Sequence, residues 1–158
     1  MPRTSRSRPR KAAPANQYYV FEIGAWELEH LLSVNSDRYR DGPYNEHLTI
    51  EFTGTCVHPE ALKGRTVRFD IAGKRDMLQP EVFQRDPEWK PRCIGALETN
   101  PSGGWFYFSV PHDSMACILT AFAHGLFRYV SLWGPALKRG KSLCTSVHLL
   151  RSVDLNEL

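Results

Sequence analysis

Cysteine and histidine are the residues of this chain whose chemistry best suits metal binding or covalent catalysis. Cys56 and His58 are two positions apart, so in an extended strand both side chains point to the same face. A tetrahedral zinc ion could take these two ligands and two more from elsewhere in the fold. Zinc modules usually show two close ligand pairs, however, and this spacing supplies one. We therefore expect no metal and no cofactor, and interpret the four scattered cysteines as reduced, mostly buried thiols.

A hydrolytic site needs a nucleophile and a base that converge from different parts of the fold. His112, Asp113 and Ser114 are the residue types of a catalytic triad, but neighbours on the chain diverge and cannot form one. Asp113 or Ser114 is better interpreted as the cap of a helix. The sequence contains no GxSxG nucleophile elbow. A small hydrolase with a Cys/His or metal-dependent site stays an alternative function, and its catalytic residues are unknown.

Aromatic residues are the second group that could carry function. Residues 105–108 place four aromatic side chains in succession, on both faces of one predicted strand. If one face is open, Tyr107 and Tyr129 could form a stacking or ligand-binding surface. If both faces are covered, these side chains belong to the core. Aromatic residues on strands are normally packing residues, so we favour the core and keep Tyr107 and Tyr129 as the candidate ligand surface.

Positive charge is concentrated at the N-terminus. The chain has a net charge of +3, but residues 1–16 hold five basic residues and no acidic one. The other 15 basic residues are set against 17 acidic residues, so the rest of the chain is nearly neutral. The candidate contacts to nucleic acid or another anion are Arg3, Arg6, Arg8, Arg10 and Lys11 in this arm, and Lys138, Arg139 and Lys141 at a predicted hairpin tip.

The elements that must position these side chains are mostly strands. Residues 1–16 mix Pro, Ser, Ala and Arg without apolar periodicity, which predicts a disordered basic arm before a single domain over residues 17–158. A 3.6-residue apolar spacing predicts one helix near residues 113–124, ended by Gly125. Alternation of apolar and polar residues, or β-branched and aromatic content, predicts strands at 18–23, 26–34, 47–57, 67–71, 93–98, 105–110, 126–133 and 142–151. A helix is the alternative for residues 26–34, which also contain good helix formers.

These elements predict a mainly β fold of the β-rich α+β class. We expect an antiparallel sandwich or a partly open barrel of about seven to eight strands, with the helix at one end or over one face. No segment of the chain has the apolar length of a membrane span, and the N-terminus lacks a secretory apolar core. We therefore expect an intracellular, cytoplasmic protein.

The absence of a catalytic constellation favours a non-enzymatic function. We expect a binding or accessory protein with a protein partner, of which a subunit of a larger assembly is one form. The first alternative is a nucleic-acid-associated protein that uses the basic arm, and the second is the hydrolase described above.

Overall fold

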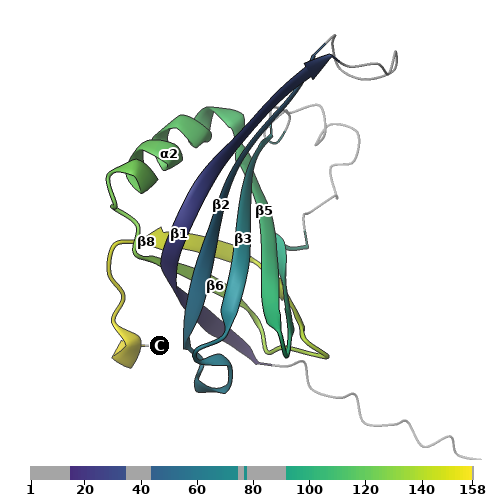
Figure 1. The fold of residues 1–158 in the computed structure, drawn as a ribbon. Helices are drawn as coiled ribbons and strands as arrows, with labels where there is room; N and C mark the ends of the chain where they lie inside the picture. The colour runs from purple at the N-terminus through teal and green to yellow at the C-terminus, as the bar shows by residue number, and fades with distance from the viewer. Residues whose placement is uncertain (1–14, 35–43, 75–76, 78–91, 158) are drawn as a thin grey trace, which may run out of the picture.

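The computed structural model describes residues 15–34, 44–74, 77 and 92–157. Eight strands form one sheet in the order β7-β4-β5-β3-β2-β1-β6-β8, and α2 (Met115–Ala123) lies beside it (Figure 1). The mainly β prediction, with about seven to eight strands and one helix near residues 113–124, is confirmed. The strands are β1 (Asn16–Val34), β2 (Tyr44–His58), β3 (Thr66–Lys74), β4 (Gly95–Asn100), β5 (Gly103–Pro111), β6 (Tyr129–Pro135), β7 (Lys141–Cys144) and β8 (Ser146–Leu150).

All neighbouring strands are antiparallel except β3 and β5, which are parallel. The sheet curls until β7 approaches β6. There, the Thr145 N–H donates to the Trp133 carbonyl at 2.8 Å and the Ser142 hydroxyl donates to the Pro135 carbonyl at 2.6 Å. Within the described residues the sheet is not closed by a strand ladder. The result is an open, curled sheet with an inner and an outer face.

The strands predicted at residues 18–23 and 26–34 are one strand. Ile23 pairs with Gly54 and Trp26 pairs with Phe52, so residues 24–25 together lie opposite a single residue of β2. This is a β-bulge, which bends a strand without ending it. The glycine between the two predicted strands therefore marks a bend, and β1 begins at Asn16, one residue before the predicted start of the domain.

The strand predicted at residues 142–151 is two strands with different partners. Cys144 at the end of β7 pairs with Gly95 of β4, whereas Ser146 at the start of β8 pairs with Trp133 of β6. The chain thus changes sheet neighbour at the residue between β7 and β8, which alternation alone does not reveal. The predicted hairpin tip is a tight turn at residues 138–141, in which residues 139 and 140 have φ angles of 53° and 79°.

The helix begins differently from the prediction and ends as predicted. A 3-10 turn, η2 (His112–Ser114), precedes α2, and neither Asp113 nor Ser114 makes a side-chain capping hydrogen bond. The reason is that Ser114 already has helical backbone angles, which turn its hydroxyl away from the capping position. At the other end, Gly125 has a φ of 63° and the Leu126 N–H donates to the Ala121 carbonyl at 2.9 Å.

The core lies on the inner face of the sheet, under α2. Phe52 stacks on Phe69 with ring centroids 4.8 Å apart, and Phe122 of the helix contacts Phe52 at 5.3 Å. Because side chains alternate along a strand, the neighbours of these buried residues point to the outer face. Among the described helices, none is both long and apolar enough to cross a membrane.

Candidate functional site

One row of side chains crosses the outer face of five adjacent strands. Each member lies directly opposite the next in the strand register, and each flanks a residue that points to the core. The order from β2 to β7 is Thr53, Arg68, Trp105, Glu98 and Lys141. This row, together with Glu51, Asp70 and Tyr107 in the row beside it, is called the Trp105 surface below.

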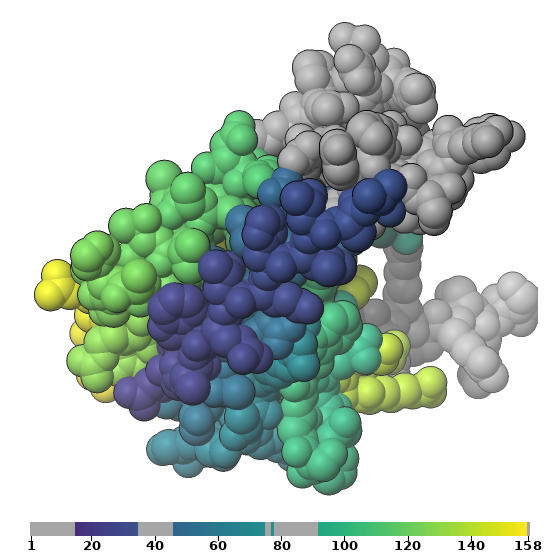
Figure 2. All heavy atoms as spheres, turned by 45° about the horizontal axis from the view of Figure 1, so that its top comes forward, coloured from purple at the N-terminus to yellow at the C-terminus, as the bar shows by residue number. Residues whose placement is uncertain are grey.

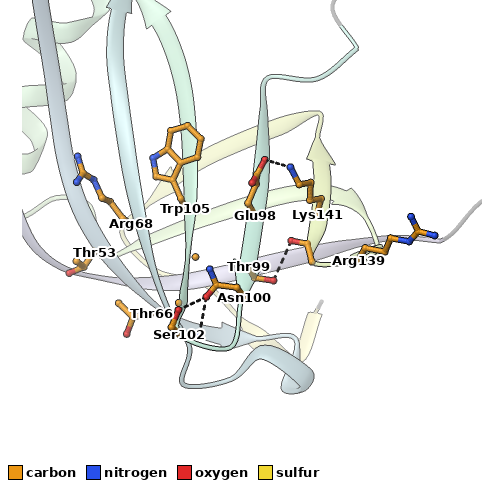
Figure 3. Close-up of a pocket in the computed structure, with 13 residues that line it drawn as sticks. Thr53, Thr66, Arg68, Glu98, Thr99, Asn100, Ser102, Trp105, Arg139 and Lys141 are labelled. Atoms are coloured by element: carbon orange, nitrogen blue, oxygen red, sulfur yellow. Dashed lines mark hydrogen bonds and ion pairs between the residues drawn. The ribbon is translucent and has the colours of Figure 1, made fainter.

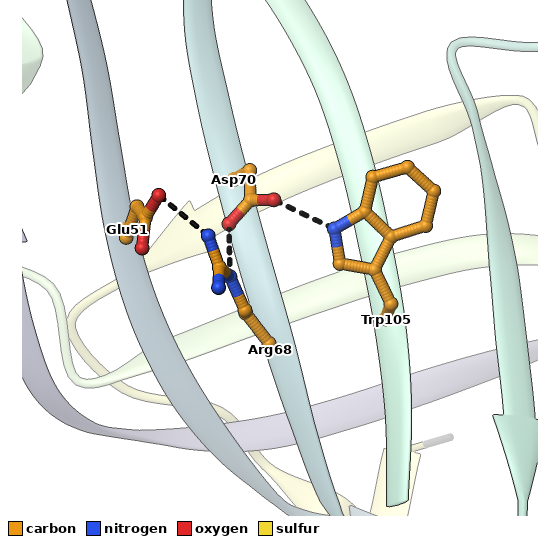
Figure 4. A network of polar contacts seen from close by, with 4 residues as sticks. All are labelled: Glu51, Arg68, Asp70 and Trp105. Carbon is orange, nitrogen blue, oxygen red and sulfur yellow. Dashed lines mark hydrogen bonds and ion pairs between the residues drawn. The ribbon is translucent and has the colours of Figure 1, made fainter.

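A buried carboxylate organises the centre of this surface (Figure 4). Asp70 is only 8% exposed, and its two oxygens accept separate hydrogen bonds. Arg68 Nε donates to Oδ1 at 2.9 Å, and Trp105 Nε1 donates to Oδ2 at 2.6 Å. Arg68 Nη2 also donates to Glu51 Oε1 at 2.5 Å. The guanidinium and the indole are therefore held in place by groups behind them, while both remain exposed.

These contacts also stabilise the charged guanidinium. The hydrogen bond to Asp70 raises the pKa of Arg68 above its usual value, and the charge of Glu51 acts in the same direction. Arginine is always protonated in proteins, and here the cation is held between two carboxylates. Its planar group keeps one defined orientation, which a flexible lysine would not do.

Two aromatic rings extend the surface along β5. Trp105 and Tyr107 are two positions apart, so both side chains point outward. Their ring centroids are 6.0 Å apart with 29° between the ring planes, and Ser109 Oγ donates to the Tyr107 hydroxyl at 3.2 Å. Trp105 is 42% exposed, so much of its ring remains free to contact a ligand.

A hollow of about 550 Å³ lies between Trp105 and the hairpin tip (Figure 3). Its far wall is fixed by the ion pair between Lys141 Nζ and Glu98 Oε1 at 2.7 Å, and by the Thr99 N–H, which donates to the Gly140 carbonyl at 2.7 Å. A second hollow of about 350 Å³ shares Thr53 and Arg68 with the first and reaches β1. The two hollows thus adjoin at Thr53 and Arg68 on the Trp105 surface.

The charged side chains that line the two hollows nearly balance. The three cations are Arg68, Arg139 and Lys141, and the three carboxylates are Glu27, Glu51 and Glu98, with Asp70 buried behind Arg68. Arg68 and Lys141 are both engaged in ion pairs with these carboxylates. The surface therefore offers aromatic faces and fixed polar groups without the excess positive charge that a polyanion requires.

The structure separates the two tyrosines of the predicted ligand surface. Tyr107 belongs to the Trp105 surface, whereas Tyr129 lies on β6 opposite Glu22 of β1, with β1, β2 and β3 between the two residues. The Arg128 guanidinium lies 6.0 Å from the Tyr129 ring centroid. The side chains of the aromatic run alternate between the two faces of β5. Phe106 and Phe108 are core residues, as favoured, whereas Trp105 points outward, so the core prediction is wrong for this residue.

The predicted anion contacts fall into two groups. Arg139 and Lys141 lie at the rim of the larger hollow, and Lys138 is exposed beside them. Lys141 is paired with Glu98, which reduces its charge toward a ligand. Five further candidates lie outside the described residues, namely Arg3, Arg6, Arg8, Arg10 and Lys11.

Cys56 and His58, the candidate metal ligands, lie at the end of β2. The Cys56 thiol is buried and donates to the His58 carbonyl at 3.2 Å. Burial raises the pKa of Cys56 to about 11, and burial raises the pKa of Cys144 to about 11 as well, which lowers the reactive thiolate fraction of both at neutral pH. In the part of the chain that the structure describes, no group of three or more His, Cys, Asp or Glu side chains is arranged to hold a metal ion.

A further polar cluster joins β1, β2 and η2. His30 Nε2 lies 3.1 Å from Glu46 Oε1, and His112 Nε2 lies 3.6 Å from Glu46 Oε2. This carboxylate connects the extended part of the β1–β2 hairpin to the segment that precedes the helix. The three residues are far apart in the chain, and sequence reasoning did not group them.

Sequence reasoning also missed Arg68 and Asp70, and it interpreted Glu51 as a surface residue of a strand. Alternation with the apolar residues Val67 and Phe69 does signal that Arg68 points outward. Its meeting with Trp105 depends on the parallel pairing of β3 with β5, for which the sequence carries no local signal. No protein family, curated protein or solved structure matches this chain.

Proposed function

We propose that this chain is a non-enzymatic binding protein that recognises a partner protein through the Trp105 surface. One observation carries the proposal: the exposed indole of Trp105 and the exposed guanidinium of Arg68 are both fixed by the same buried carboxylate, Asp70. Side chains that are already ordered lose little conformational entropy when a partner binds. A surface of this kind is prepared for recognition before the partner arrives.

The composition of the surface supports a protein as the partner. Trp, Tyr and Arg are the residues most enriched among those that dominate the binding energy of protein interfaces, and all three occur here side by side. The balanced charge favours a polypeptide with mixed apolar and polar side chains over a nucleic acid. We expect an apolar or aromatic side chain of the partner against Trp105, with hydrogen bonds to the polar groups around it.

Affinity capture with a matched control tests the proposal. The tagged full-length protein, its Trp105→Ala variant and its Lys63→Ala variant are compared in cells that produce the protein. Lys63 is exposed in the turn between β2 and β3 and lines neither hollow of the Trp105 surface. We expect a partner that is retained by the wild type and by Lys63→Ala but lost from Trp105→Ala. With that partner purified, we expect Trp105→Ala to raise the Kd by about thirtyfold, which corresponds to roughly 2 kcal/mol.

Arg68→Lys provides an independent variant. It keeps the positive charge but cannot donate to Glu51 and Asp70 through a planar fork, so we expect weaker binding here too. Thermal unfolding of each variant separates loss of binding from loss of fold. Unchanged Kd values for both Trp105→Ala and Arg68→Lys, in folded proteins, would contradict the proposal.

A further inference from the structure

The second half of β1 has a sheet neighbour on one side only, among the described residues. The register between β1 and β6 ends where Glu22 pairs with Tyr129, after which the Ile23 N–H donates to the Arg128 carbonyl at 2.8 Å. From Trp26 to Val34, β1 pairs with β2 alone. Figure 1 shows this part of the hairpin rising beyond the neighbouring strands, and in Figure 2 the end of β1, in dark blue, lies at the molecular surface.

The register identifies the residues whose backbone groups face this open edge. Ile23 directs its N–H toward β6. Although Ile23 lies opposite Gly54 in the register, its backbone N–H and C=O groups therefore point away from β2. The bulge shifts the alternation by one residue, and Trp26 then takes the equivalent position opposite Phe52. The residues that present N–H and C=O groups to the open edge are therefore Trp26, Leu28, His30, Leu32 and Val34.

These same residues are largely apolar and exposed. Leu32 is 62% exposed and Val34 is 76% exposed, and Leu28 is exposed as well. Natural edge strands are usually protected by charged side chains, especially Lys, by Pro or by bulges, because unpaired backbone groups invite another strand. The open segment from Trp26 to Val34 contains neither Lys nor Pro, and its two carboxylates, Glu27 and Glu29, lie on the outer face. It therefore has the properties of a strand that is completed by a partner.

We propose that a second copy of this chain pairs its own β1 with this edge, antiparallel, about a two-fold axis at His30. In this register Trp26 lies opposite Val34 of the second copy, and Leu28 lies opposite Leu32 of the second copy. On the other face Glu27 meets a serine, Ser33, and Glu29 meets a leucine, Leu31. On the inner face, apolar side chains thus meet apolar side chains on both sides of the axis, at which His30 lies opposite His30 of the second copy, and no carboxylate opposes another.

Other registers are less favourable. An axis at Leu28 places Glu27 of one copy opposite Glu29 of the other, where like charges directly across a ladder are destabilising. An axis at Leu31 shortens the paired segment to residues 28–34 and leaves Trp26 without a partner in the ladder. The axis at His30 pairs the whole open segment, and it is self-complementary, as an interface between identical copies must be.

Sedimentation equilibrium of the purified full-length protein tests the dimer. Leu32→Lys replaces an edge leucine with a long cation opposite Leu28 of the second copy, so we expect its dimer Kd to rise by about tenfold or more. Leu155→Lys makes the same substitution at an exposed leucine in η3 (Leu155–Glu157), outside the edge, and we expect an unchanged dimer Kd. A wild type that stays monomeric, or equal dimer Kd values for the two variants, would overturn the proposal.

Disulfide crosslinking tests the register and does not rely on Leu32→Lys folding. In a Cys117→Ser background, which removes the exposed cysteine, His30→Cys and Leu31→Cys are oxidised separately. A hydrogen-bonded pair across the axis has Cα atoms about 5.5 Å apart, within the range of a disulfide. We expect covalent dimers from His30→Cys and little crosslinking from Leu31→Cys. Crosslinking from Leu31→Cys alone, or from neither variant, would exclude an axis at His30.

Discussion

At the scale of single residues, Asp70 is the group on which the Trp105 surface depends. It is a carboxylate on the outer face of a sheet, yet it is buried, because Arg68 and Trp105 close over it. Carboxylates on the outer face are normally hydrated, whereas Asp70 accepts hydrogen bonds from two side chains in place of water. The two side chains that donate hydrogen bonds to Asp70 are thus the same ones that shield it from water.

Replacement of Asp70 should reduce stability. In Asp70→Ala, the Trp105 N–H and part of the Arg68 guanidinium lose their acceptor, and we expect the free energy of unfolding to fall by about 1–3 kcal/mol. Urea unfolding measures this change. Glu60→Ala is the control, because its ion pair with Lys63 is exposed and should contribute little. Equal stabilities of the two variants would show that Asp70 does not hold the surface together.

The cysteines should differ in reactivity according to their burial. Cys117 is exposed on α2, whereas burial raises the pKa of Cys56 and of Cys144 from 9.0 to about 11. Since the thiolate is the nucleophile, we expect iodoacetamide to modify Cys117 first at pH 8. Modification of Cys56 and Cys144 should rise only as the pH approaches 11. Mass spectrometry of the alkylated protein reports each site, and rapid modification of Cys56 at pH 8 would contradict its burial.

At the scale of elements, the surface exists because β4, β5 and β3 lie side by side. Gly95 at the start of β4 allows this close approach. A Cβ atom there would meet the Tyr107 carbonyl and would lie 2.7 Å from Phe106 Cζ. The strand that carries Glu98 can therefore reach β5 only with glycine at this point.

Alanine at position 95 should destabilise the sheet. We expect Gly95→Ala to lower the free energy of unfolding by about 1–3 kcal/mol, because backbone and a packed ring must move. Gly24→Ala is the matched control: its Cβ would meet mainly the Thr53 side chain, at 2.9 Å from Oγ1, which can rotate away. Thermal or urea unfolding compares the two. A larger loss of stability from Gly24→Ala than from Gly95→Ala would contradict the packing described for β4.

At the scale of the whole molecule, charge is divided between residues 1–14, which make up most of the predicted basic arm, and the rest of the chain. The five cations within residues 1–14 precede β1, whereas the Trp105 surface is nearly neutral. If the protein binds nucleic acid, as the alternative function requires, the arm is the part with the necessary charge. The arm and the Trp105 surface would then serve different ligands.

Removal of residues 1–14 tests this alternative and leaves β1 whole. If this alternative holds, the full-length chain binds DNA at low salt and the shortened chain binds it more weakly. Each lost phosphate contact should flatten the slope of log K against log salt by about 0.9. Titration of fluorescent DNA at several salt concentrations measures the slope. Identical slopes for the two chains, or no binding by the full-length chain at low salt, would rule out a role of the arm in nucleic-acid binding.

The sequence by itself determined the features that depend on local periodicity. Alternation along residues 67–71 and the aromatic run at residues 105–108 predicted both strands, and a 3.6-residue spacing followed by Gly125 predicted the helix and its end. These features are predictable because the direction of each side chain follows from the backbone geometry of its own strand or helix. The division of charge along the chain is likewise a property of the sequence alone.

Only the tertiary structure decided which strands became neighbours. The parallel pairing of β3 with β5 brings Asp70 to Trp105, and the pairing of β7 with β4 brings Lys141 to Glu98. Strand pairing is set by the packing of the whole core, and residues distant in the chain contribute to it as much as close ones. The individual residues of the Trp105 surface could thus be assigned to strands in advance, but their meeting is a product of the complete sheet.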